Sequence, residues 1–173
     1  MGSDVEHRSG MSKSIFEQDA EFRDFIADLF AMSAGMQSLR RAIARRIGLG
    51  GTELGILLSV GRLAPQGAVN VRQVADHLHV AATHITTEVN TLVAKGLLEK
   101  QASEQDNRAV ELSVTPVGAE LLASIGPNLQ MINEALFDHP SPAAILEQRR
   151  FFQRIIAGLP EALARLPRPP KGP

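Results

Sequence analysis

The segment that decides the fold runs from Asn70 to Gly118 and reads NVRQVADHLHVAATHITTEVNTLVAKGLLEKQASEQDNRAVELSVTPVG. It opens with Asn70 as an N-cap and Gln73 at the third helical position, a capping-box pattern that predicts a short helix ending near Leu78. After a brief turn, apolar residues at helical spacing predict a second helix over residues 82–95. Two helices joined by a turn of three or four residues form a helix-turn-helix unit.

Behind this unit the period of the apolar residues changes to two. Val110, Leu112 and Val114 alternate with polar residues, which is typical of a strand, and a polar loop at residues 103–107 separates them from a shorter strand around residues 98–100. A β-hairpin directly behind a helix-turn-helix is the order of a winged helix. The predicted fold class is therefore mostly α with a small β-hairpin wing.

Further helices flank the winged-helix lobe on both sides. Apolar residues recur every three or four positions from Phe22 to Ile47, which predicts one long amphipathic helix. A short, mostly apolar helix with Thr52 as its N-cap follows and is expected to be central. Beyond the Thr115 cap we expect one helix to about Leu136 and a last helix from residue 145 to 159. These outer helices carry more apolar surface than one lobe can cover, which usually marks an interface.

Composition excludes several classes of protein. The 173 residues carry 18 basic and 19 acidic side chains, a net charge of −1, and 44% are hydrophobic. No run approaches the ~18 apolar residues of a membrane helix, and the start lacks a signal-peptide pattern, so we predict a cytoplasmic protein without a membrane partner. The absence of cysteine excludes disulfides, thiolate metal sites and thiol nucleophiles. Residues 1–14 are expected to be disordered, and residues 166–173 form a Pro-rich tail.

The hairpin region resembles a known family. The run Gly96-Leu-Leu-Glu-Lys100, the triplet Asp106-Asn-Arg108 and the run from Ala109 to Gly118 resemble the wing and following helix start of the MarR family of transcription regulators. The resemblance extends from about Phe22 to Leu163. It implies a single MarR-like chain over residues 15–165, with dimerisation helices at 15–48 and 116–165 and a winged-helix DNA-binding lobe at 52–115.

The same resemblance implies a function. Family members are obligate homodimers that bind pseudo-palindromic double-stranded DNA, so a ligand-responsive regulator is expected, a repressor that a small-molecule effector releases. The second helix of the motif would enter the major groove. Its outward residues, which could contact bases or phosphates, are Thr83, His84, Thr86, Thr87 and Asn90.

The wing and its surroundings supply further predicted contacts. Arg108 would reach the minor groove, with Asp106 holding its side chain, and Lys100 and Arg72 would contact phosphates. Taken singly, exposed polar residues are ordinary solvent surface, and Asp106 with Arg108 could be only a surface ion pair. Their joint placement behind a helix-turn-helix favours the DNA interpretation.

Charge is distributed unevenly along the chain. Residues 69–115 hold four basic and six acidic side chains, a net charge of −2, whereas residues 36–63 hold five arginines and one glutamate, a net charge of +4. Ala81 also stands where the family usually has a Ser or Thr cap. These departures predict modest DNA affinity with a shallow salt dependence.

The family resemblance also places an effector pocket between the dimerisation helices and the DNA-binding lobe. It implies four lining residues, which are Met32, Met36, Arg40 and Leu57. Methionine suits an adaptable apolar wall, and arginine would pair with a carboxylate, so an anionic aromatic effector or an acyl thioester is expected.

Three alternatives stand beside this interpretation. The negative lobe leaves room for a dimeric protein-interaction module with weak or lost DNA binding. His77, His79 and His84 motivate a metal-responsive regulator, although residues two apart on a helix face different ways and zinc needs about four convergent ligands. An enzyme is disfavoured because the glycines at residues 48–51 follow a helix instead of a strand and no acid–base constellation is visible. No cofactor is predicted.

Overall fold

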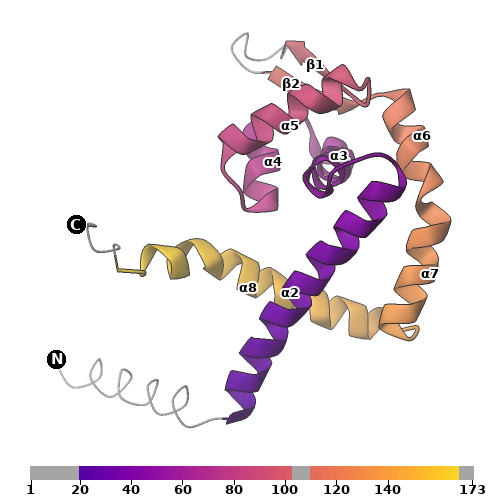
Figure 1. Ribbon diagram of the computed structural model, residues 1–173. Coiled ribbons are helices and arrows are strands. Elements are labelled where there is room, and N and C mark those ends of the chain that lie inside the picture. Colours follow the sequence, from indigo (N-terminus) through magenta and orange to yellow (C-terminus); the bar gives the residue numbers. More distant parts are fainter. Residues whose placement is uncertain (1–19, 103–109, 168–173) are drawn as a thin grey trace. The chain divides into compact units, whose positions relative to one another are not determined.

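The computed structural model describes residues 20–102 and 110–167 (Figure 1). The chain divides into two units, one ending at Ile125 and one beginning at Gly126, and each is described by itself. The predicted disordered segment 1–14, the loop 103–109 and the last residues of the Pro-rich tail lie outside the described residues.

Helix α2 spans Ala20–Arg46 and confirms the long amphipathic helix. Its last turns hold its buried residues, Ile43 and Ala44. The helix ends at Arg46, and Gly48 behind it has a φ of 72°, in the left-handed region that favours glycine. The amide of Leu49 then donates to the Ala44 carbonyl at 3.0 Å, which satisfies one of the last carbonyls of the helix.

Helix α3 spans Gly51–Leu63 and is the centre of the first unit, as expected from its apolar sequence. Leu54, Ile56 and Leu57 are at most 1% exposed. The prediction that Thr52 caps this helix is wrong, because the N-cap is Gly50. Gly50 has no side chain to cap the helix. Instead Glu53, in the first turn, accepts the Gly50 amide with its Oε2 at 2.6 Å.

No single helix within the described ranges is long and apolar enough to cross a membrane. Helix α2 and the segment Gly51–Gln66 are long and apolar enough only as a pair, and the pair is bent by 91° at its junction.

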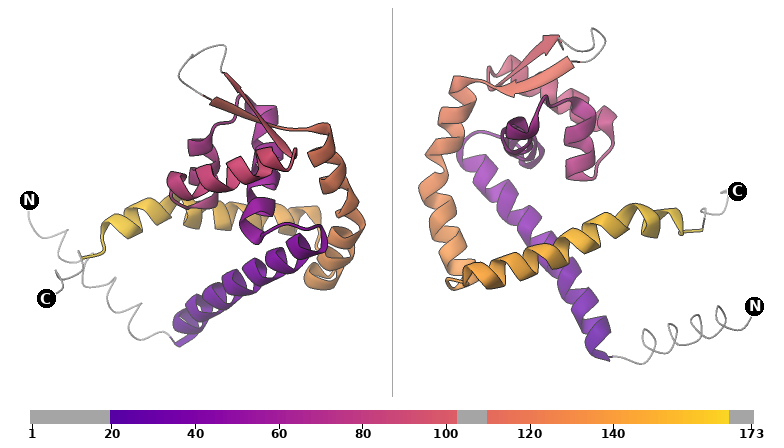
Figure 2. Two further views of the ribbon diagram at one scale, coloured as in Figure 1. Left: turned by 45° about the horizontal axis from the view of Figure 1, so that its top comes forward. Right: turned by 180° about the vertical axis from the view of Figure 1, so that it is seen from behind.

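Helices α4 (Val71–Leu78) and α5 (Ala82–Ala94) form the predicted helix-turn-helix. The capping box is confirmed, because Asn70 Oδ1 accepts the Gln73 amide at 3.0 Å and Gln73 Oε1 accepts the Asn70 amide at 2.8 Å. His79 turns the chain after α4 with a left-handed φ of 54°. Two views of this lobe, with α5 lying beside the hairpin, appear in Figure 2.

The wing is a two-stranded antiparallel hairpin of β1 (Leu98–Ala102) and β2 (Val110–Val114). Lys100 pairs with Leu112, and the Leu112 amide donates to the Val69 carbonyl at 2.7 Å, which joins the hairpin to the segment before α4. A short 3₁₀ helix, Ala64–Gln66, follows α3. Thr115 caps α6 (Pro116–Ser124) as predicted, accepting the Gly118 amide at 3.0 Å.

The expectation of one continuous helix from Pro116 to Leu136 is wrong. Helix α6 ends at Ser124, and α7 (Gly126–Phe137) begins after Ile125. Pro127 gives the physical reason, because it has no amide to donate to the preceding turn.

The second unit consists of α7 and α8 (Pro142–Ala164). Asp138 and His139 adopt positive φ at the connection, and Ser141 caps α8 by accepting the Ala144 amide at 3.2 Å. None of the residues described in this unit is buried, and many of its apolar side chains are exposed.

Candidate nucleic-acid interface

Helix α5 presents one polar face and one apolar face. The apolar face packs into the lobe through Ile85, Val89 and Leu92, each with 0% exposure. All five residues predicted to face outward are exposed, namely Thr83, His84, Thr86, Thr87 and Asn90. The helical period therefore brings them together on the solvent side of the unit.

The N-terminal end of α5 lacks a side-chain cap. Ala81 is the N-cap, and no side chain bonds to the free amides there, as its sequence predicted. One turn further on, the Thr86 hydroxyl donates to the Ala82 carbonyl at 3.0 Å. That hydroxyl offers only its lone pairs outward, so it can accept from a base amino group but cannot donate.

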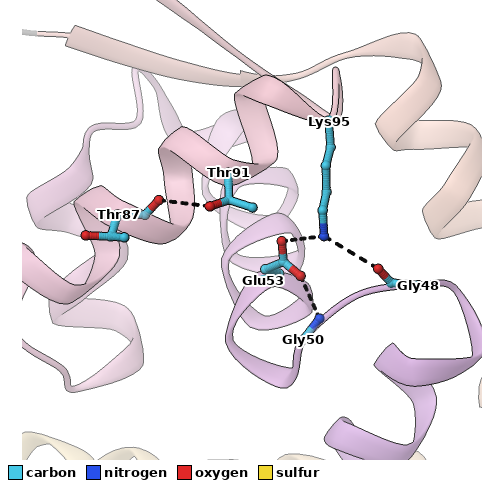
Figure 3. A network of polar contacts seen from close by, with 6 residues as sticks. All are labelled: Gly48, Gly50, Glu53, Thr87, Thr91 and Lys95. Atoms are coloured by element: carbon cyan, nitrogen blue, oxygen red, sulfur yellow. Dashed lines mark hydrogen bonds and ion pairs between the residues drawn. The ribbon is translucent and has the colours of Figure 1, made fainter.

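The C-terminal end of α5 is linked to the start of α3 by a partly buried polar network (Figure 3). Lys95 Nζ lies 2.6 Å from Glu53 Oε1 and 3.5 Å from the Gly48 carbonyl, while the Gly50 amide donates to the other carboxylate oxygen. Burial alone would raise the pKa of Glu53, but the Gly50 amide and Lys95 outweigh it and hold that pKa below its ordinary value. These contacts therefore favour the charged carboxylate, which links the end of α5 to the α2–α3 junction.

This network was missed by the sequence analysis. Glu53 and Lys95 are 42 residues apart, and each has a conventional position in its own helix, the first turn of α3 and the end of α5. Only the capping potential of Glu53 behind Gly50 was visible as a local signal.

The wing contributes Lys100, whose Nζ donates to Asn90 Oδ1 at 2.6 Å. Two residues that were predicted as separate DNA contacts are thus joined. Arg72 is exposed in the first turn of α4. Asp106 and Arg108 lie outside the described residues, so their minor-groove role stays a prediction.

The predicted effector residues occupy two different environments. Met32, Met36 and Arg40 lie at intervals of four on α2 and so share one face; both methionines are nearly half exposed. Leu57 is fully buried in the core and offers no surface.

Arg40 is half-buried, and its Nε is buried without a hydrogen-bond partner in the part of the chain that the structure describes. A Cβ placed on Gly55 would lie 3.1 Å from Arg40 Nη1, so the guanidinium lies against the backbone of α3.

The three histidines do not form a metal site. Within residues 20–102 and 110–167, no three His, Cys, Asp or Glu side chains gather as metal ligands. Burial, together with the positive charges of Arg62 and His79, lowers the pKa of His77. The metal-responsive alternative therefore lacks a ligand cluster among the residues that the structure describes.

Part of this chain is similar in sequence to known proteins. Residues 47–109 match the family model described as MarR family. The uncharacterized HTH-type transcriptional regulator YdcH of Bacillus subtilis (strain 168) is 33% identical over 79 residues, which are 46% of this chain and 48% of that protein. The chain thus spans about half the length of the curated relative that it matches.

The fold is also similar to solved structures. CouR from Rhodococcus jostii RHA1 bound to p-coumaroyl-CoA gives a TM-score of 0.67 at 20% identity, covering 80% of this chain and 96% of that chain. The S. aureus MepR–DNA complex gives a TM-score of 0.60 at 16% identity, covering 76% of this chain and 94% of that chain. These likenesses establish the winged-helix fold.

Proposed function

We propose that this chain, whose residues 47–109 match the MarR family model, is a transcription regulator of that family that binds a pseudo-palindromic operator as a homodimer. The exposed polar face of α5 beside the wing carries the proposal. Family members are transcription regulators and not enzymes, and the proposal includes no catalysis and no cofactor.

The recognition helix would place its N-terminal half in the major groove. Thr83 and His84 stand in the first turn of α5, where base contacts concentrate in helix-turn-helix proteins. Arg72 would contact the phosphate backbone, and Arg108 the minor groove. The likeness to MepR, whose structure contains DNA, supports this mode of binding. A cytoplasmic location is part of the proposal.

Exposed apolar side chains support the homodimer. Phe30 on α2 is 74% exposed, and α7 and α8 of the second unit carry many exposed apolar residues, Met131 and Leu163 among them. Such surfaces are rarely left to water in a soluble protein. We propose that residues 15–48 and 116–165 form the dimer interface, which would set the half-sites about one DNA turn apart.

Arg40 motivates the effector part of the proposal. A buried, unpartnered guanidinium nitrogen is costly, and an anionic group would satisfy it. Met32 and Met36 on the same face of α2 would contact the apolar part of an aromatic carboxylate or acyl thioester. The p-coumaroyl-CoA bound to CouR is a ligand of this chemistry. Leu57 is fully buried, so it would support this surface from the core without contacting the effector.

The effector would act by linkage. If it stabilises a dimer whose half-site spacing does not match the operator, then effector and DNA weaken each other by the same factor. The chain would then be a repressor that its effector releases. Arg40→Met should abolish the effector response while DNA binding persists, and Arg45→Met, an exposed arginine of the same helix, should leave the response intact.

A second candidate function follows from charge. Residues 69–115 carry a net charge of −2, which is unusual for a surface that approaches phosphates. A dimeric protein-interaction module with weak or lost DNA binding is the alternative.

One experiment separates the two. The protein is titrated at low salt into a fluorescence-labelled DNA duplex from the region upstream of its own gene, and its affinity is compared with that for a scrambled duplex of equal composition. The regulator should prefer the upstream duplex, and Thr83→Ala with His84→Ala should remove that preference, whereas Gln130→Ala on α7 should not. Equal affinity of the unmodified protein for both duplexes would count against the operator-binding proposal.

A further inference from the structure

The contact between Asn90 and Lys100 changes what each residue can recognise. Lysine has donors and no acceptor, so the Asn90 atom at 2.6 Å from Lys100 Nζ must be the amide oxygen Oδ1. The orientation of the Asn90 amide is thereby determined, with its NH₂ group directed away from Lys100. In the described part of the chain no other hydrogen bond to either side chain is present.

The pair is therefore rich in donors. The Asn90 NH₂ group and the two remaining Lys100 protons give up to four N–H donors and one positive charge. Recognition of adenine by asparagine needs the amide oxygen as acceptor for the base N6 amino group. Here a charged donor already uses one of the two lone pairs of that oxygen. An acceptor-only ligand can accept from the Asn90 NH₂ group and from Lys100 together, so it fits the pair better than adenine, which would bring a further donor beside the ammonium group.

The position of the pair distinguishes between two acceptor-only ligands, a guanine edge and a phosphate. Asn90 lies seven residues after Thr83, about 10 Å further along the helix axis. Base contacts of a recognition helix come mainly from its N-terminal end. Lys100 lies on the wing strand, on the same face as buried Leu98, and this face is the one that packs on α5.

The scarcity of free cations in the lobe also favours a phosphate ligand for this pair. Among the described residues of segment 69–115, Lys95 is bound to Glu53, which leaves Arg72 and Lys100 as the cations without a carboxylate partner. A lobe with so few free cations depends on each of them for phosphate contact.

We propose that Asn90 and Lys100 form one phosphate-binding unit that holds the operator backbone between the C-terminal half of α5 and the wing, and that Asn90 does not read a base. This inference rests on the proposed DNA binding. The ligand class is a DNA backbone phosphate, bound by the Asn90 amide and the Lys100 ammonium together.

The test measures affinity for the upstream duplex, for the scrambled duplex and for a panel of single-base-pair variants of the upstream duplex. Asn90→Ala and Lys100→Ala should each weaken binding to every duplex by a similar factor, on the order of 5- to 20-fold at low salt, without changing the order of preference. Lys100→Ala should also lower the slope of log affinity against log salt by about one, and Lys100→Arg should restore the slope.

Asn90→Asp separates a direct contact from a merely positioning role. It keeps an acceptor for Lys100 but removes the NH₂ donors, so it should bind DNA more weakly than Asn90→Ala does. Gln101→Ala, the neighbouring exposed residue of β1, is the matched control and should bind as the unmodified protein does. Circular dichroism verifies that each variant is folded.

Loss of discrimination at one base pair in Asn90→Ala would overturn the inference, because it would make Asn90 a base reader. Unchanged affinity in both alanine variants would overturn it as well. If the unmodified protein binds neither the upstream nor the scrambled duplex, the proposed function fails together with the inference; if it binds and the variants behave as it does, only the inference fails.

Discussion

Replacing Lys95 with methionine should destabilise the protein, because it removes the cation beside a buried carboxylate. Methionine keeps the length of the side chain and its apolar stem but not the charge. Glu53 is 8% exposed at its side chain, and Lys95 is 37% exposed. Lys95 stands at the C-terminal end of α5, the helix proposed to enter the major groove. The substitution therefore also tests what holds this helix in place.

The expected loss of unfolding free energy in Lys95→Met lies between two limits. An exposed ion pair contributes about 0–1 kcal/mol, whereas breaking a buried pair by removing one partner costs about 3–5 kcal/mol. Because Glu53 is buried but Lys95 is partly screened, we expect a loss of about 2 kcal/mol. In a chain of this length that loss lowers Tm by about 4–8 °C. The double variant with Glu53→Gln should lose less than the two single variants together, since it leaves no buried charge.

The pH dependence gives a second readout. A carboxylate whose pKa is lowered in the folded state contributes stability that is fully present above the ordinary value of 4.5. That contribution is lost as the pH falls through the lower, folded-state pKa. Glu53→Gln should therefore flatten part of the acid limb of the stability curve, whereas at neutral pH it is less stable than the unmodified protein.

The assay is urea unfolding followed by far-ultraviolet circular dichroism at constant protein concentration, because the chain has neither Trp nor Tyr and dimerisation would make stability concentration-dependent. The control is Glu161→Gln, which removes the exposed pair with Arg165 and should change stability by less than about 0.5 kcal/mol. A comparably small effect of Lys95→Met, with an acid limb unchanged in Glu53→Gln, would refute the reasoning.

Three further substitutions test local features of the lobe. Gly118→Ala should cost more than about 2 kcal/mol, because the added Cβ would overlap the carbonyl oxygen of Leu97; thermal unfolding checks this, and an unchanged Tm would contradict it. Ala81→Ser should stabilise the protein by about 0.5–1 kcal/mol by supplying the missing cap of α5, and a lower stability in urea unfolding would argue against it. Asn70→Ala should cost about 1 kcal/mol because it removes the acceptor of the Gln73 amide, and amide hydrogen exchange should show faster opening of the first turn of α4 than in the unmodified protein.

Local patterns in the sequence predicted most of the elements. The change of period behind residue 96 predicts the wing, and the caps at Asn70 and Thr115 predict where two helices begin. These signals succeed because helical and strand periodicity and capping act over a few residues. The same locality explains two errors. Gly50 replaced Thr52 as N-cap because Glu53 caps from inside, and the helix after Pro116 breaks at Ile125 ahead of Pro127.

The contacts that give the lobe its chemistry were decided only by the tertiary structure. Glu53 meets Lys95 because α3 packs against α5, and Lys100 meets Asn90 because β1 packs on the same helix. The sequence by itself determined which residues would face outward from α5, since that depends on helical period alone. It could not determine which of them would bond to one another, because such pairing depends on how separate elements pack together.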